Sequence, residues 1–205
     1  MFYETIKNRK QVRWYDQERF PKTTLISDCL KKTYETVASK QNLMPYKVTV
    51  IGPFNKKLNQ GLYEISQHSG VNANYNLLTA PYQFIYTVRL AEGNAKVERD
   101  LAGGHSQPPM DPKKYKDRII IKSTNIEIGM HATILSKLLI ENGLDVSYTL
   151  CFEDFESNPD YWIDRGFNFI NDEVQFIMSA GYPDPEKYVE SWEDKPDYSK
   201  VVAWI

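Results

Sequence analysis

Two arginines and an amide side chain occupy alternate positions near the start of the chain, at Arg9, Gln11 and Arg13. In an extended backbone, side chains at alternate positions point the same way. Two guanidinium groups beside an amide donor would then form a site for a planar anion, because the guanidinium fork matches phosphate oxygens. The alternative interpretation is a solvated basic turn at the end of a helix.

The overall composition implies that any anion site is local. The 205 residues suit a single domain, 1–205, and the hydrophobic and charged fractions of 41% and 25% are ordinary for a globular protein. The net charge of −2 gives no general attraction for nucleic acid or an anionic membrane. No apolar run approaches the roughly 18 residues of a membrane span, and the first residues lack the apolar core of a signal peptide. Cys29 and Cys151 lie far apart and the histidines are scattered, so we expect no metal site and a reducing cytoplasm.

Hydrophobic periodicity predicts helices and strands in an irregular order. We expect helices at 2–9, 25–39, 58–65 and 126–142, and strands at 46–51, 82–90, 146–152 and 174–180. This order is typical of an α+β fold, because the regular alternation of a doubly wound sheet is missing. No G-x-G-x-x-G follows a strand, which disfavours a dinucleotide bound in the Rossmann manner.

Two segments of this pattern have special positions. The polar segment 91–123 contains paired glycines and paired prolines, and we expect a lid with partial helix at either end. The helix 126–142 is expected to be central and to end at Gly143, a residue that readily adopts the left-handed conformation. The side chains expected on its buried face are Met130, Ile134, Leu135, Leu138 and Leu139.

Four short motifs along the chain together resemble those of a known family. They are Arg9-x-Gln11-x-Arg13, Ala38-Ser39-x-x-Asn42-x-Met44-Pro45-Tyr46, Asn142-Gly143-Leu144-Asp145 and Gly181-Tyr182-Pro183. In these motifs and their order the chain resembles the nitroreductase-like FMN-dependent oxidoreductases. The resemblance implies a nitroreductase-like α+β fold with a mixed central β-sheet flanked by helices. It also implies a homodimer in which the C-terminal tails are exchanged.

The first motif would bind both ends of FMN. By the resemblance, Arg9 and Gln11 would hold the phosphate, and Lys10 would contribute its main chain. Arg13 would lie near the flavin N1 and C2 carbonyl, where negative charge develops on reduction. A fixed cation at that position stabilises the added charge and raises the reduction potential.

The resemblance implies further cofactor contacts at positions spread along the chain. Ser39, Gln41 and Asn42 would face the flavin edge, although a polar helix end that satisfies its own carbonyl groups is the alternative. Asn76 would meet the ribityl chain, with Asn72 and Asn74 as competing candidates. Lys195 would approach the phosphate, or would simply belong to a solvated charge run.

This sequence departs from the family's pattern at several positions. Gln11 replaces a serine, Ala38 replaces a proline, and Met44-Pro45-Tyr46 stands in place of Q-P-W. Many members carry P-I-E-G where this chain has Tyr148-Thr149-Leu150-Cys151, and backbone amides there approach the flavin N5. Leu150 and Cys151 can supply such amides too. We expect Cys151 to be a small buried strand residue rather than a redox thiol.

The implied function is an NAD(P)H-dependent FMN oxidoreductase. Hydride would pass from NADH or NADPH to a small acceptor, such as a nitroaromatic or a quinone, by a ping-pong mechanism on the flavin. No side-chain acid, base or nucleophile would be required, because the chemistry belongs to the cofactor. One alternative is a flavin-binding protein of the same fold without general reductase activity. Another is a dimeric module that binds an anion or nucleotide without flavin.

Overall fold

The computed structural model of the chain describes residues 12–39, 44–53, 55–68, 74–88, 102–103, 124–152, 154–169, 173–187 and 198–202. Its helices are α2 (Thr23–Thr36), α3 (Lys56–His68), α4 (Tyr75–Thr79), α7 (Asn125–Glu141), α8 (Pro159–Asp164) and α9 (Tyr198–Val201), with a 3-10 turn at Phe155–Ser157. Its strands are β1 (Tyr46–Ile51), β2 (Tyr82–Val88), β3 (Asp145–Thr149) and β4 (Val174–Gly181).

The four strands form one sheet in the order β1-β2-β4-β3. Each neighbouring pair is antiparallel, and β2 and β4 occupy the centre. The α+β class expected from the sequence is confirmed. The expected mixed sheet is wrong for the strands that the structure describes, because all their pairings are antiparallel.

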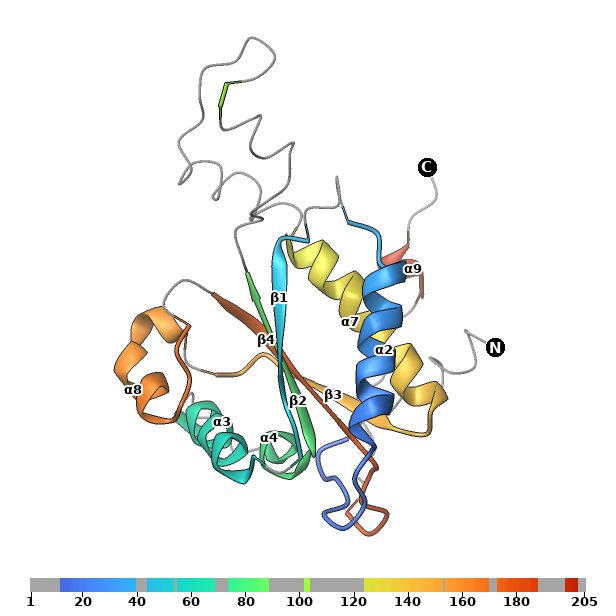
Figure 1. Cartoon of the computed structure of the whole chain (residues 1–205), viewed down its shortest axis with the longest axis vertical. Coiled ribbons are helices and arrows are strands. Elements are labelled where there is room, and N and C mark those ends of the chain that lie inside the picture. The colour runs from blue at the N-terminus through green and yellow to red at the C-terminus, as the bar shows by residue number, and fades with distance from the viewer. Residues whose placement is uncertain are drawn as a thin grey trace.

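Helices cover both faces of this sheet, as Figure 1 shows. On one face, α2 and α7 pack over a cluster that includes Phe84, Tyr86 and Leu135. On the other face, α3 and α8 pack over a second cluster that includes Ile85 and Trp162. Because both faces are covered, every residue of β2 is buried, although its side chains alternate between the faces.

Helix α7 lies close to its expected range, and its expected buried face is confirmed at Leu135 and Leu139 but not at Met130. Ile128, Leu135 and Leu139 are buried, whereas Met130 is 38% exposed. The expected stop at Gly143 is confirmed, since Gly143 has φ of 78°. Its N–H donates to the Ile140 carbonyl and the N–H of Leu144 donates to the Leu139 carbonyl, which is the Schellman arrangement.

Other boundaries differ from the expected ones. Helix α2 ends at Thr36 rather than near Ser39, and the periodic pattern misses α4 and α8, which are too short to show a helical stripe. Strand β3 ends at Thr149, so residues 150–152 lie outside it. The expected helix at 2–9 and nearly all of the expected lid at 91–123 lie outside the described residues. Within the described part of the chain, every helix is too short or too polar to span a membrane.

Candidate functional site

A row of buried polar side chains crosses the sheet on the face opposite α2 and α7. Gln83 of β2 pairs with Ser179 of β4, and Ser179 pairs with Ser147 of β3, so the three residues are neighbours in register. All three are fully buried. Their apolar neighbours along each strand point to the α7 side, because side chains alternate. We call Gln83, Ser179 and Ser147 the polar row.

Helix α4 is fixed to the polar row by Asn76. The Asn76 amide donates to Thr149 Oγ1 at 2.9 Å and to Ser179 Oγ at 3.0 Å. Ser179 Oγ donates in turn to Gln83 Oε1 at 2.6 Å, and Gln83 Nε2 donates back to the Asn76 carbonyl at 3.0 Å. Asn76 is fully buried, so these bonds replace all of its contact with water.

Arg13 lies beside this network and contacts two asparagines of the same segment. Its Nη1 donates to Oδ1 of Asn76 and to Oδ1 of Asn74, each at 3.4 Å. Asn74 Nδ2 donates to the main-chain carbonyl of Cys151 at 3.1 Å. The structure therefore brings together three positions singled out in the sequence, namely Arg13, Asn76 and Cys151, and Asn74 joins them.

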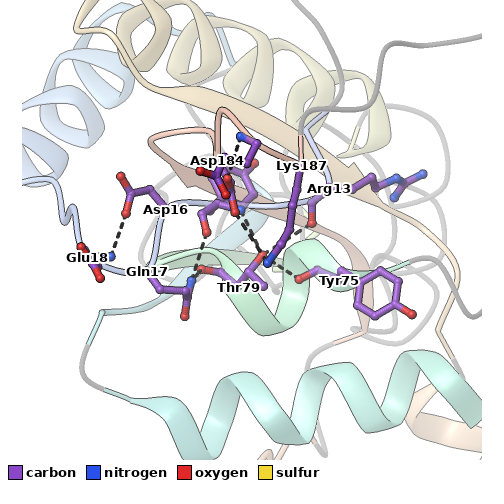
Figure 2. Close-up of polar contacts among 10 residues, drawn as sticks. Arg13, Asp16, Gln17, Glu18, Tyr75, Thr79, Asp184 and Lys187 are labelled. Atoms are coloured by element: carbon purple, nitrogen blue, oxygen red, sulfur yellow. Dashed lines mark hydrogen bonds and ion pairs between the residues drawn. The ribbon is translucent and has the colours of Figure 1, made fainter.

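The chain around Arg13 is held on several sides. Trp14 stacks on Tyr75 of α4, with ring centroids 4.4 Å apart and planes at 18°. The Tyr15 hydroxyl reaches the polar row, where it shares a hydrogen bond with Ser147 Oγ at 3.1 Å and donates to the Ser179 carbonyl at 3.2 Å. Figure 2 shows this segment crossing α4 at Thr79, whose carbonyl accepts from Gln17.

One of the other sequence motifs, Gly181-Tyr182-Pro183, meets this segment, and a second motif meets Gly181. Tyr15 forms an isolated antiparallel bridge with Pro183, and the N–H of Asp184 donates to the Trp14 carbonyl at 3.1 Å. Gly181, which begins the Gly181-Tyr182-Pro183 motif, pairs with Asp145 at the start of β3. The segment that directly follows the first motif, the motif at Gly181–Pro183 and the motif that ends at Asp145 are thus successive neighbours in space, although they are separated along the chain.

The charge of Arg13 is not neutralised by the described part of the protein. Arg13 is half-buried, and no carboxylate of the described residues lies within ion-pair distance of it. In Figure 2 its guanidinium extends away from Asp16, Glu18 and Asp184, on the same side as the ring of Tyr75. A half-buried cation whose partners are neutral amide oxygens can bind an anionic group of a ligand.

Ser39 has different partners. Its hydroxyl donates to Glu127 Oε2 at 2.6 Å and accepts from the Met44 N–H at 2.9 Å. One turn further along α7, His131 Nδ1 lies 2.9 Å from the Tyr86 hydroxyl. Burial lowers the pKa of His131 to about 4, so its ring is neutral at pH 7. Glu127 and His131 are both buried. This pair was not identified from the sequence, although two polar residues four apart on an apolar helix were a usable signal.

The expected burial of Cys151 is wrong. Strand β3 ends at Thr149, and beyond it Leu150 is 71% exposed and the Cys151 side chain is exposed as well. The other site residues expected from the sequence lie outside the described residues: Arg9, Lys10, Gln11, Gln41, Asn42 and Lys195. The described residues contain no group of three or more His, Cys, Asp or Glu side chains placed to hold a metal ion.

The chain has an α+β fold that it shares with nitroreductases of known structure. An inferred NAD(P)H:FMN oxidoreductase of Staphylococcus epidermidis superposes with a TM-score of 0.72 and 16% identity, over 100% of this chain and 96% of that one. An inferred nitroreductase of Exiguobacterium sibiricum, crystallised with FMN, superposes with a TM-score of 0.71 and 15% identity, over 100% of this chain and 97% of that one. A BluB-like flavoprotein of Clostridium difficile superposes with a TM-score of 0.66 and 15% identity, over 100% of this chain and 99% of that one. No protein-family model and no curated protein sequence matches the chain.

Proposed function

We propose that this protein is an FMN-dependent oxidoreductase that takes hydride from NADH or NADPH and passes it to a small acceptor of the nitroaromatic or quinone kind. The observation that carries the proposal is Arg13, a half-buried cation held by Asn74 and Asn76 without a carboxylate partner among the described residues. The fold supports the same function, because one structure that shares it holds FMN and another is an inferred NAD(P)H:FMN oxidoreductase.

In this proposal Arg13 acts through its charge. Bound FMN supplies the hydride chemistry, since the organic mechanism belongs to the cofactor. A cation held beside the N1 edge of the ring stabilises the negative charge that develops on reduction. Buried amide partners hold the guanidinium in place, so little reorganisation is needed when that charge develops. Donor and acceptor would use the same site in turn, which is a ping-pong scheme.

Further residues would complete the cofactor site. The main chain at Leu150 and Cys151 is proposed to approach N5, and the position of both residues outside β3, where both are exposed, is compatible with that role. The polar atoms of the Asn76 amide already contact protein groups, so it would support Arg13 rather than hold the ribityl chain alone. The remaining proposed contacts are Arg9, Lys10, Gln11 and Lys195 at the phosphate, and Ser39, Gln41 and Asn42 at the flavin edge.

We further propose that the protein is a homodimer with exchanged C-terminal tails. Ile126 at the start of α7 is 65% exposed, Leu150 is 71% exposed and Val201 of α9 is 69% exposed. Large apolar side chains with this exposure suit a surface that a second copy covers. Equilibrium sedimentation at micromolar concentration should then give twice the mass of the chain. The two cysteines are free, which is compatible with the reducing cytoplasm that we propose as its location.

A visible spectrum tests the function directly. Protein purified without added cofactor should be yellow, should release FMN on denaturation, and should oxidise NADH or NADPH when a quinone is supplied. A colourless protein that neither binds added FMN nor oxidises either nucleotide would contradict the proposal and would leave an anion-binding module as the function of Arg13.

One observation favours a second candidate, a flavoprotein without general reductase activity. The segment 148–151 differs from the family pattern, and its Tyr148 hydroxyl is engaged with Ser136 of α7 at 2.6 Å. One structure with the same fold is described as a BluB-like flavoprotein and not as a reductase. Bound FMN with negligible NAD(P)H turnover across several acceptors would favour this second function.

A further inference from the structure

Asn74 occupies a helix-capping position but does not cap the helix. It precedes α4, and asparagine at such a position usually accepts a hydrogen bond from the N–H two or three residues later. Here its side chain makes no cap hydrogen bond. The Oδ1 atom accepts from Arg13 and the Nδ2 atom donates to the Cys151 carbonyl. A residue that departs from its usual local role, as Asn74 does here, often belongs to a functional site.

The two bonds of Asn74 connect parts of the chain that are otherwise far apart in sequence. Arg13 is 61 residues away and Cys151 is 77 residues away. Asn74 is only 3% exposed, so neither bond is in strong competition with water. One amide therefore sets the distance between the guanidinium group and the main chain at residue 151.

The neighbouring residue of each partner limits how far this connection can move. Trp14, next to Arg13, stacks on Tyr75, which is next to Asn74. Tyr75 in turn stacks on Tyr63 of α3, with centroids 5.8 Å apart. The stacked rings hold the two backbone segments together, while the polar side chains on either side of Tyr75 hold the guanidinium.

We propose that Asn74 is a positioning residue, which orients the Arg13 guanidinium and couples it to the main chain of Cys151. This inference rests on the proposed function, because its consequence is read on FMN. Arg13 would touch the flavin edge, and Asn74 would act through Arg13. Loss of Asn74 would leave the charge present but mobile, so that it stabilises the reduced flavin less well.

Four variants test the role of Asn74: Asn74→Ala, Asn74→Ser, Arg13→Gln and the double variant Arg13→Gln/Asn74→Ala. Serine is as good a helix cap as asparagine but is too short to reach both partners. The matched control is Asn158→Ala, because Asn158 does cap its helix, accepting from the Tyr161 N–H at 3.4 Å. The FMN midpoint potential of each protein is measured by equilibration with a reference dye.

We expect Arg13→Gln to disfavour the reduced flavin about tenfold, equivalent to about 30 mV for a two-electron couple. Asn74→Ala and Asn74→Ser should each disfavour it about threefold in the same direction. The double variant should match Arg13→Gln alone, because Asn74 has no effect without the guanidinium. Asn158→Ala should lower the stability of the protein and leave the potential unchanged.

A second measurement uses the protein without cofactor. Urea unfolding of the same set should give an interaction between Arg13 and Asn74, so that the two losses of stability are not additive. A wild-type potential in both Asn74 variants, or an additive shift in the double variant, would overturn the inference. Wild-type protein that binds no FMN would instead remove the proposed function, and the positioning role with it.

Discussion

The hydroxyl of Tyr15 lies 3.1 Å from the hydroxyl of Ser147, and this contact joins the segment that carries Arg13 to the edge strand β3. The same Tyr15 hydroxyl donates to the Ser179 carbonyl at 3.2 Å. Tyr15 is 1% exposed and Ser147 is 0% exposed. The position of Arg13 therefore depends on the interior of the sheet and not only on surface contacts.

Replacement of Tyr15 by phenylalanine should weaken this attachment. The ring would remain packed, but Ser147 would lose a hydrogen-bond partner in a buried position, which costs about 1–2 kcal/mol of the free energy of unfolding. Urea unfolding should detect this loss. Tyr34→Phe is the matched control, because Tyr34 is 65% exposed and its loss of a hydroxyl should change stability little. Equal effects of the two changes would contradict a role for the buried contact.

The two arginines of the first motif should have separable effects. Arg13→Gln should lower the reduction potential of bound FMN and change the affinity for FMN by less than about threefold. Arg9→Gln should weaken FMN binding about tenfold or more, because the proposed charge-assisted contact with the phosphate would be lost, and should leave the potential nearly unchanged. Fluorescence titration measures the affinity. Equal effects on both quantities would mean that the pair serves only as a phosphate clamp.

The buried His131 should make the protein less stable in mild acid. Its pKa falls from 6.5 to about 4 on folding, so the unfolded chain binds more protons than the folded protein between these two values. Stability contributed by the neutral ring is present above pH 6.5 and is lost as the pH falls towards 4. Between pH 7 and pH 5 the loss from this residue should be about 2 kcal/mol.

Urea unfolding of wild type and His131→Gln at both pH values isolates this effect. Glutamine keeps a polar partner for the Tyr86 hydroxyl and does not titrate. The variant should therefore lose less stability than the wild type on acidification. An identical pH dependence in both proteins would show that His131 is not the group responsible.

Gly181 should not tolerate a side chain. A Cβ atom at this position would lie 2.5 Å from Pro81 Cδ, so Pro81 would have to shift. It would also lie 3.0 Å from Tyr15 Cδ1, so the ring next to the Arg13 segment would have to move slightly. Gly181→Ala should therefore destabilise the protein by about 1–3 kcal/mol and weaken FMN binding. Gly129→Ala is the matched control, since nothing lies within 4 Å of its Cβ position in α7. That change should stabilise the helix by about 0.5–1 kcal/mol.

The sequence was most informative where one local signal was enough. The β-branched run at Tyr46–Ile51, the apolar helix before Gly143 and the strand before Gly181 all agree with local propensity. The buried face of α7 was predicted only in part: Leu135 and Leu139 join the core, whereas Met130 has a suitable spacing but is exposed.

The polar contacts of the site could be predicted only in part. Arg13 was singled out by its spacing, and Asn76 by the resemblance, which implies a ribityl contact before the second strand. Asn74 was only a competitor for the role of Asn76, since its partners at Arg13 and Cys151 depend on how α4 is docked. The alternation of Ser147 and Thr149 in β3 was a usable signal for a polar face, but only the strand pairing shows that Gln83 and Ser179 continue it.

The polar row has a consequence for how this protein can change over evolutionary time. A helix can pack on an apolar sheet face at several positions along the strands. The hydrogen bonds of the polar row to Asn76 and Tyr15, in contrast, form at one position only. A shift by one position would leave several buried groups unbonded, at about 1–3 kcal/mol for each. Substitutions at the row are therefore expected to arise together in descendants of this chain, while the exposed loops around the site can vary independently.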